Sequence, residues 1–188
     1  MIRYAAFILL LAATSLTSCN QEIKEERLKR IDSLGTHLNH VSEVIASVDS
    51  AMIQSRLDEM DRNANWLNDN INGEIKLPTA IKFGDYMRCQ KFYGKALNRY
   101  RKVKSELQYS EKQMETLRKD VKNSFYSDEE FEGYFRTEAE AIKSLIEATD
   151  ELEGSYDAVN EQYMKTKPAA TSILDSIKSV IYSSEPLI

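Results

Sequence analysis

Two histidines and a glutamate at three-residue steps have the types and the spacing to ligate a metal ion. His37 and His40 are the only histidines of the chain, and Glu43 follows at the same step. On a helix the three side chains lie along one strip, and imidazoles and carboxylates are common ligands of zinc and other transition metals. Each histidine lies beside an expected apolar position (Leu38 or Val41) instead of occupying one, so we expect the strip to face solvent.

Glu138 is a second candidate for chemistry, because it is a carboxylate where its helix should be apolar. Burial shifts the pKa of such groups, and catalytic acids and bases often have shifted values. If this helix packs antiparallel to the preceding one, Ser110 and Gln113 lie opposite. We expect Glu138 to pair with a polar neighbour and to fix the register. The sequence has no nucleophile elbow, phosphate-binding loop or cysteine-pair zinc motif.

The segment from Asn68 to Thr79 resembles the calcium-binding loop of EF-hand proteins. Oxygen-bearing side chains alternate from Asn68 onward, Gly73 stands at the sharp turn, and Ile75 follows two residues later. All three alternate positions are neutral asparagines, however, and Thr79 stands where the EF-hand has its bidentate glutamate. Because calcium affinity follows ligand charge, we expect an asparagine-rich helix end and an Asn-Gly turn there. We predict neither a metal nor a cofactor.

The start of the chain has three parts in order. Arg3 supplies one positive charge, residues 4–13 are uncharged and mostly apolar, and Leu16-Thr17-Ser18-Cys19 follows. The apolar run is shorter than the ~20 residues of a membrane-spanning helix, and its length and flanks are typical of a secretory signal. The Leu16–Cys19 tetrapeptide resembles the lipobox of bacterial lipoproteins. In that family a peptidase cuts before the cysteine, whose thiol carries a diacylglycerol.

The resemblance implies a signal peptide over residues 1–18, lipidation of Cys19 with acyl chains such as palmitate, and a short tether over 19–24. Residues 25–188 would form a single helical bundle domain. Two or three acyl chains hold a protein on a membrane where one does not. Asn20 differs from the aspartate that retains lipoproteins in the inner membrane of enteric bacteria. An exported lipoprotein, membrane-anchored through its N-terminal lipid in the outer membrane and facing the periplasm or the cell surface, is therefore expected.

The net charge limits the molecules that the chain could bind, and the cysteine count limits its disulfides. Removing Arg3 with the leader leaves 24 of the 25 basic residues against 30 acidic ones. This acidic balance argues against nucleic acid, which rewards clustered Lys and Arg. With Cys19 lipidated, Cys89 has no partner for an intrachain disulfide, and its apolar surroundings predict a small buried side chain.

Apolar residues recur at alternating three- and four-residue steps over three long segments, spanning residues 31–71, 86–121 and 131–180. Extended to the breaks that flank it, each segment predicts a helix of ~45–55 residues, or ~70–80 Å. The pattern slips by one residue between Met52 and Ile53, which changes the winding of a coiled coil without ending it. We predict an all-α fold, an elongated antiparallel three-helix coiled-coil-like bundle running up-down-up.

The ends of these helices are also marked. Asn72-Gly73, with a residue in the left-handed region, and Pro78 should end the first helix, and residues 123–127 separate the second from the third. Ser127 and Glu130 have the spacing of a capping box. The third helix should be kinked or broken near Pro168.

Antiparallel packing also predicts which aromatic side chains meet. Tyr86 should face Tyr163, Tyr93 should face Tyr156, and Trp66 should lie at the same level. The sequence therefore favours a non-enzymatic, lipid-anchored envelope protein of structural, tethering or protein-binding type. Two alternatives stay open: a metal-binding or enzymatic bundle that uses the histidine strip or Glu138, and a self-associating rod.

Overall fold

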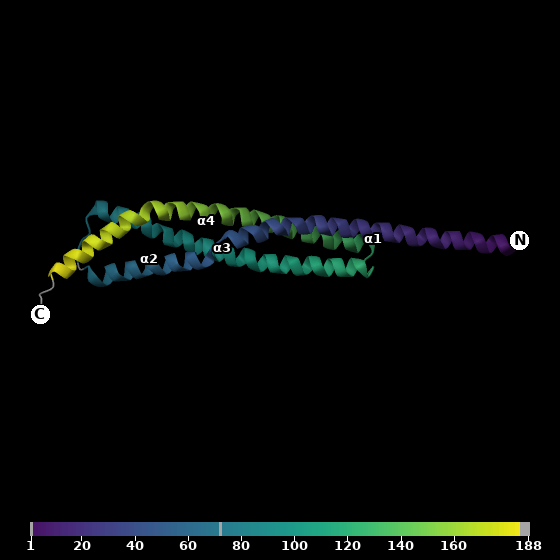
Figure 1. Cartoon of the computed structure of the whole chain (residues 1–188), viewed down its shortest axis with the longest axis horizontal. Helices are drawn as coiled ribbons and strands as arrows, with labels where there is room; N and C mark the ends of the chain where they lie inside the picture. The colour runs from purple at the N-terminus through teal and green to yellow at the C-terminus, as the bar shows by residue number, and fades with distance from the viewer. Residues whose placement is uncertain (1, 72, 185–188) are drawn as a thin grey trace. The chain divides into compact units, whose positions relative to one another are not determined.

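The protein is all-α, as the computed structural model in Figure 1 shows. The backbone is described for residues 2–71 and 73–184, and the side chains for residues 21–71 and 73–183. The described part consists of helices without strands. They are α1 (Ile2–Ser47), α2 (Ser50–Asn70), α3 (Leu77–Lys122) and α4 (Asp128–Ser184). Helices α1 and α2 occupy the segment in which a single first helix was predicted.

The prediction that the first helix continues through its slip is wrong. The helix ends at Ser47 and a new one begins at Ser50, with Asp49 as N-cap accepting a 2.8 Å hydrogen bond from the Met52 amide. The buried positions pass from Val48 to Ile53, a step of five residues. In an unbroken helix, residues five apart lie on different faces, so Val48 and Ile53 could not both face the core. The helix therefore ends between them, and Asp49, a residue type that caps helix N-termini well, begins the next one.

The first helical segment ends two residues before the predicted Asn72-Gly73 turn. Helix α2 ends at Asn70, and Ile71 takes an extended conformation while its amide donates to the Leu67 carbonyl at 3.0 Å. Gly73 does not have a positive φ, and Asn72 lies outside the described residues. The extended Ile71 therefore stops this helix, and the left-handed residue expected at Asn72 or Gly73 is not at Gly73. Pro78 lies in the first turn of α3, where a missing amide costs nothing.

The turn between α3 and α4 caps the C-terminus of α3 and the N-terminus of α4 with hydrogen bonds. Ser124 has a φ of 57°, its amide donates to Val121, and the Phe125 amide donates to Asp120, both at 3.1 Å. This pattern is a Schellman motif with serine at the left-handed position. The predicted capping box is confirmed, because the Ser127 amide donates to Glu130 at 2.9 Å and the Glu130 amide donates back at 3.3 Å.

The chain divides into two compact units. Unit 1 comprises Met1–Glu43 and Ser105–Glu147, and unit 2 comprises Val44–Lys104 and Ala148–Ile188. In unit 1 the core lies between α1, the second part of α3 and the first part of α4. Its largest fully buried side chains are Ile31, Val41, Phe131 and Ile142. Arg27 pairs with Asp128 and Arg30 with Glu132, so α4 runs parallel to α1. The short turn before α4 reverses the chain, so α3 runs antiparallel to both, and its Arg118 pairs with Asp32.

Unit 2 has a core with more aromatic side chains, formed by α2, the first part of α3 and the second part of α4. Of the predicted core positions in this part of α3, Tyr86, Cys89, Tyr93 and Ala96 are confirmed at 1% exposure or less, whereas Tyr100 is only half-buried and Leu97 is buried in its place. Tyr86 meets Tyr163 at a ring distance of 5.8 Å, as predicted. The other two aromatic predictions are wrong. Tyr93 also contacts Tyr163, at 5.7 Å, while the Tyr156 hydroxyl binds the Asp49 amide, and Trp66 lies against Lys178.

Helix α4 passes through Pro168 without a break, and Figure 1 shows its ribbon bending where the colour turns to yellow. A proline ring displaces the carbonyl one turn earlier, which bends a helix that neighbouring helices hold together. Beyond it Ala170 is buried, as the apolar spacing predicts, but the predicted core positions Ile173 and Val180 do not match. Leu174 is buried in place of Ile173, and Val180 is 68% exposed. A helix with 3.6 residues per turn drifts from a 3.5-residue pattern in this direction.

Candidate functional site

The candidate residues from the sequence do not gather into one site. His37, His40 and Glu43 lie exposed on α1. Within the described part of the chain, no three His, Cys, Asp or Glu side chains are close enough to hold a metal ion together. Cys19 and residues 1–18 lie outside the described side chains. Among the described residues, no helix is both long enough and apolar enough to cross a membrane.

Glu138 is half-buried in unit 1, and burial raises the pKa of its carboxyl. The predicted hydrogen bonds to Ser110 and Gln113 are absent from this described region, so that pairing is wrong. A carboxylate at the edge of an apolar face keeps part of its hydration, because full burial beside one hydroxyl would not repay the lost water.

The other two sequence candidates also lie apart. Cys89 is fully buried, as expected, and burial raises the pKa of its thiol. In the segment compared with an EF-hand loop, Asn68 and Asn70 belong to α2, and the Asn70 amide donates to the Trp66 carbonyl at 2.8 Å. Because these side chains follow a helix, they do not form the start of a calcium-binding loop.

A network of polar side chains lies inside unit 2 and was not predicted. Glu59 on α2 accepts hydrogen bonds from the Tyr86 hydroxyl at 3.2 Å and from the Tyr163 hydroxyl at 3.0 Å. The Lys167 ammonium lies 2.9 Å from both Glu59 and the Tyr163 hydroxyl. Asn63 donates to Tyr86 at 3.3 Å. One carboxylate therefore connects all three helices of the unit.

Arg56, one turn earlier on α2, forms the second half of this network. Its guanidinium donates to the Tyr93 hydroxyl and, at 2.6 Å, to the Asn160 carbonyl oxygen, which also accepts from Tyr93 at 2.8 Å. It also lies 4.3 Å from the centre of the Tyr163 ring. The planar guanidinium combines hydrogen bonds in its plane with stacking on its face, which a lysine does not reproduce.

The network sets the protonation states of its members. Burial alone would raise the pKa of Glu59, but the hydrogen bonds from Lys167 and Tyr163 outweigh it and lower this pKa. The same contacts raise the pKa of Lys167. Burial raises the pKa of Tyr93 to about 12. At neutral pH the network is therefore a carboxylate, an ammonium and neutral phenols. Since these groups satisfy one another, we assign them to holding the helices in register.

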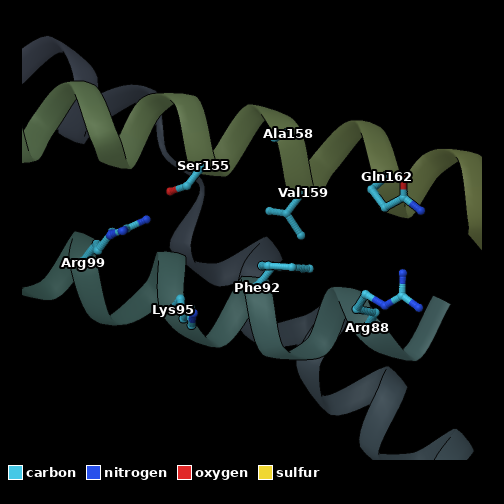
Figure 2. Close-up of a pocket in the computed structure, with 8 residues that line it drawn as sticks. All are labelled: Arg88, Phe92, Lys95, Arg99, Ser155, Ala158, Val159 and Gln162. Atoms are coloured by element: carbon cyan, nitrogen blue, oxygen red, sulfur yellow. The ribbon is translucent and has the colours of Figure 1, made fainter. Parts of the chain in front are cut away.

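Unit 2 also contains an open groove between α3 and α4, with a volume of about 560 Å³. Arg88, Phe92, Lys95 and Arg99 come from α3, and Ser155, Ala158, Val159 and Gln162 come from α4. Figure 2 shows Arg88 and Arg99 reaching toward α4 on either side of Phe92 and Val159. The groove thus has an apolar middle with a guanidinium at each end.

The guanidiniums have only weak partners within the chain. Arg88 lies 3.3 Å from Asp85, one turn away on α3, and Arg99 lies 3.3 Å from Glu151. These pairs are exposed, and each arginine has five donors, so both retain donors for another anion. Phe92 is 46% exposed, although it is a large aromatic side chain. This combination is suited to binding a ligand with carboxylates and an apolar surface.

Sequence reasoning missed both features because it followed the apolar positions. The signal for the network was the need of buried tyrosine hydroxyls for partners. The signal for the groove was the four-, three- and four-residue spacing of Arg88, Phe92, Lys95 and Arg99, which places them on one helix face. Comparison of the chain with protein-family models, with curated proteins and with solved structures finds no match.

Proposed function

We propose that this chain is a lipid-anchored protein of the bacterial envelope that binds another protein through unit 2. The lipobox-like Leu16–Cys19 supports the anchor, with Cys19 as the lipidated residue, in the outer membrane facing the periplasm or the cell surface. The observation that carries the binding function is the groove between α3 and α4, with an exposed phenylalanine between two guanidiniums. Aromatic and arginine side chains in a concave surface are the residues on which protein interfaces most depend.

The groove favours binding over the enzymatic alternative. The most connected ionisable groups of unit 2, Glu59 and Lys167, are bound to each other and to tyrosines. The groove itself holds cations and an apolar surface, and the Ser155 hydroxyl in its wall donates to the Leu152 carbonyl at 3.0 Å, which favours recognition of a ligand over chemistry on it. This is the chemistry of a binding surface.

One experiment in intact cells tests both parts of the proposal. A photo-crosslinking amino acid replaces Phe92 in the full-length precursor, and a matched variant carries it at Tyr109, which is also exposed on α3 but belongs to unit 1. We expect a discrete protein adduct at position 92 and none at 109. In a Cys19→Ala background the protein should leave the membrane fraction. Equal labelling at both positions would contradict the binding site, and unchanged membrane association would contradict the anchor.

A further inference from the structure

We infer that the α3/α4 groove binds an acidic amphipathic helix of a partner protein, and this inference rests on the proposed binding function. The helix would place its apolar residues on Phe92 and Val159 and its carboxylates at Arg88 and Arg99. Laying an amphipathic helix into a groove is a common way for helical proteins to bind partners.

The charge distribution favours an acidic partner, although the whole chain is acidic. The segment from residue 77 to 104 contains one acidic residue, Asp85, and eight basic ones: Lys82, Arg88, Lys91, Lys95, Arg99, Arg101, Lys102 and Lys104. Counted over the sequence, unit 1 carries the whole net charge of −5, and unit 2 is neutral. An approaching anion is therefore attracted to the α3 face of unit 2, because complementary charge steers association.

The spacing of the arginines defines the partner's spacing. Arg88 and Arg99 are eleven residues apart on one helix, which corresponds to ~16 Å along its axis. Two carboxylates on a partner helix reach both guanidiniums if they are separated by about three turns. Lys95 lines the same groove one turn from Arg99 and adds a third cation. A guanidinium binds a carboxylate through two parallel hydrogen bonds, so the ends of the groove fix the orientation of the partner.

The middle of the groove is apolar, so the partner helix needs apolar residues as well as acidic ones. Figure 2 shows Phe92 and Val159 facing each other across the groove, and the α4 wall beside them consists of Ser155 and Ala158. Small side chains on one wall let another helix come close. One or two leucine-sized residues on the partner would remove the exposed surface of Phe92 from water, which favours binding.

Two other occupants fit less well. A bilayer favours apolar side chains that project from a convex face, whereas Phe92 lies in a groove between two helices. A second copy would have to offer its acidic stretch over residues 128–147. The apolar positions of that stretch, including Phe131, Ile142 and Leu145, are buried in unit 1. Of its large apolar side chains Tyr134 is exposed, at 56%, so the stretch offers charge and one aromatic ring without an apolar stripe.

The test uses a defined peptide and the full mature chain in detergent. The probe is a fluorescent helical peptide of about 20 residues with leucine at heptad positions a and d and glutamate at e and g. We expect saturable binding that weakens as salt rises, and at least a tenfold loss in Arg88→Glu/Arg99→Glu. Phe92→Ala should weaken binding to a similar extent.

Matched controls make the outcome specific. Lys91→Glu/Lys102→Glu has the same charge change and the same eleven-residue spacing, but these lysines do not line the groove; it should change binding less than about twofold. The same peptide with lysine at e and g should not bind. Equal losses in both double variants would overturn the inference, as would no binding at all, or tighter binding to anionic vesicles or a second copy. An adduct at position 92 in cells would then still support the proposed function.

Discussion

At the scale of single residues, Glu59 shows how one carboxylate holds three helices together. Its two oxygens accept from Tyr86, Tyr163 and Lys167, which come from the two neighbouring helices. The Glu59 side chain is 30% exposed, so water and salt screen its ion pair with Lys167. The hydrogen bonds from the two phenols to Glu59 therefore contribute more to stability than its ion pair with Lys167 does.

We predict that Glu59→Gln lowers the free energy of unfolding by about 1–2 kcal/mol at pH 7. The pKa of Glu59 is lowered in the folded state, so its contribution is present above the unfolded-state value and is lost as pH falls through the folded-state value. The difference between wild type and variant should therefore shrink below an ordinary value near 4.5. Urea unfolding at pH 7 and at about pH 3.5 measures it, with the exposed Glu161→Gln as control. A difference that does not depend on pH would contradict this role.

At the scale of elements, the sequence predicts what the apolar spacing controls. The core positions of α3 from Tyr86 to Val121, except Tyr100, and the Ser127 capping box follow from local patterns, so these were predicted correctly. The break at Asp49 was missed because a one-residue slip in a pattern does not tell whether a helix rewinds or ends. The N-cap geometry decides that, and it depends on the backbone. The groove was missed because it depends on which side chains two helices bring together.

The end of α3 provides a test at the same scale. Ser124 holds a φ of 57°, a conformation in which glycine is free of the steric cost that other residues bear. We predict that Ser124→Gly raises the free energy of unfolding by about 0.5–1 kcal/mol. Ser124→Val should lower it by about 1 kcal/mol, because a β-branched side chain is poorly tolerated there. Thermal unfolding of the two variants beside Ser124→Ala measures this, and equal effects of glycine and valine would contradict the Schellman geometry.

At the scale of the whole molecule, the two units differ in net charge and in how their charged residues are distributed over the helices. Unit 1 carries the net charge of −5, much of it on residues 128–147, so its charges repel one another on balance. Unit 2 is neutral overall but has its positive charge on α3 and its negative charge on α2 and α4. The Arg99–Glu151 pair at 3.3 Å is one contact between these oppositely charged helices. Attraction therefore outweighs repulsion in unit 2.

Salt should act on the two units with opposite sign. Raising NaCl from about 20 mM to about 500 mM shortens the screening length from roughly 20 Å to about 4 Å. We predict that hydrogen exchange in residues 77–104 then becomes faster, because screening removes the attraction between α3 and its neighbours. Exchange in residues 128–147 should stay the same or become slower, because screening relieves repulsion there. Exchange measured by mass spectrometry on the same sample compares both segments, and Lys102→Glu should reduce the salt effect in unit 2 alone. If both segments responded to salt in the same direction, net charge would govern stability and the segregation of charge within unit 2 would not.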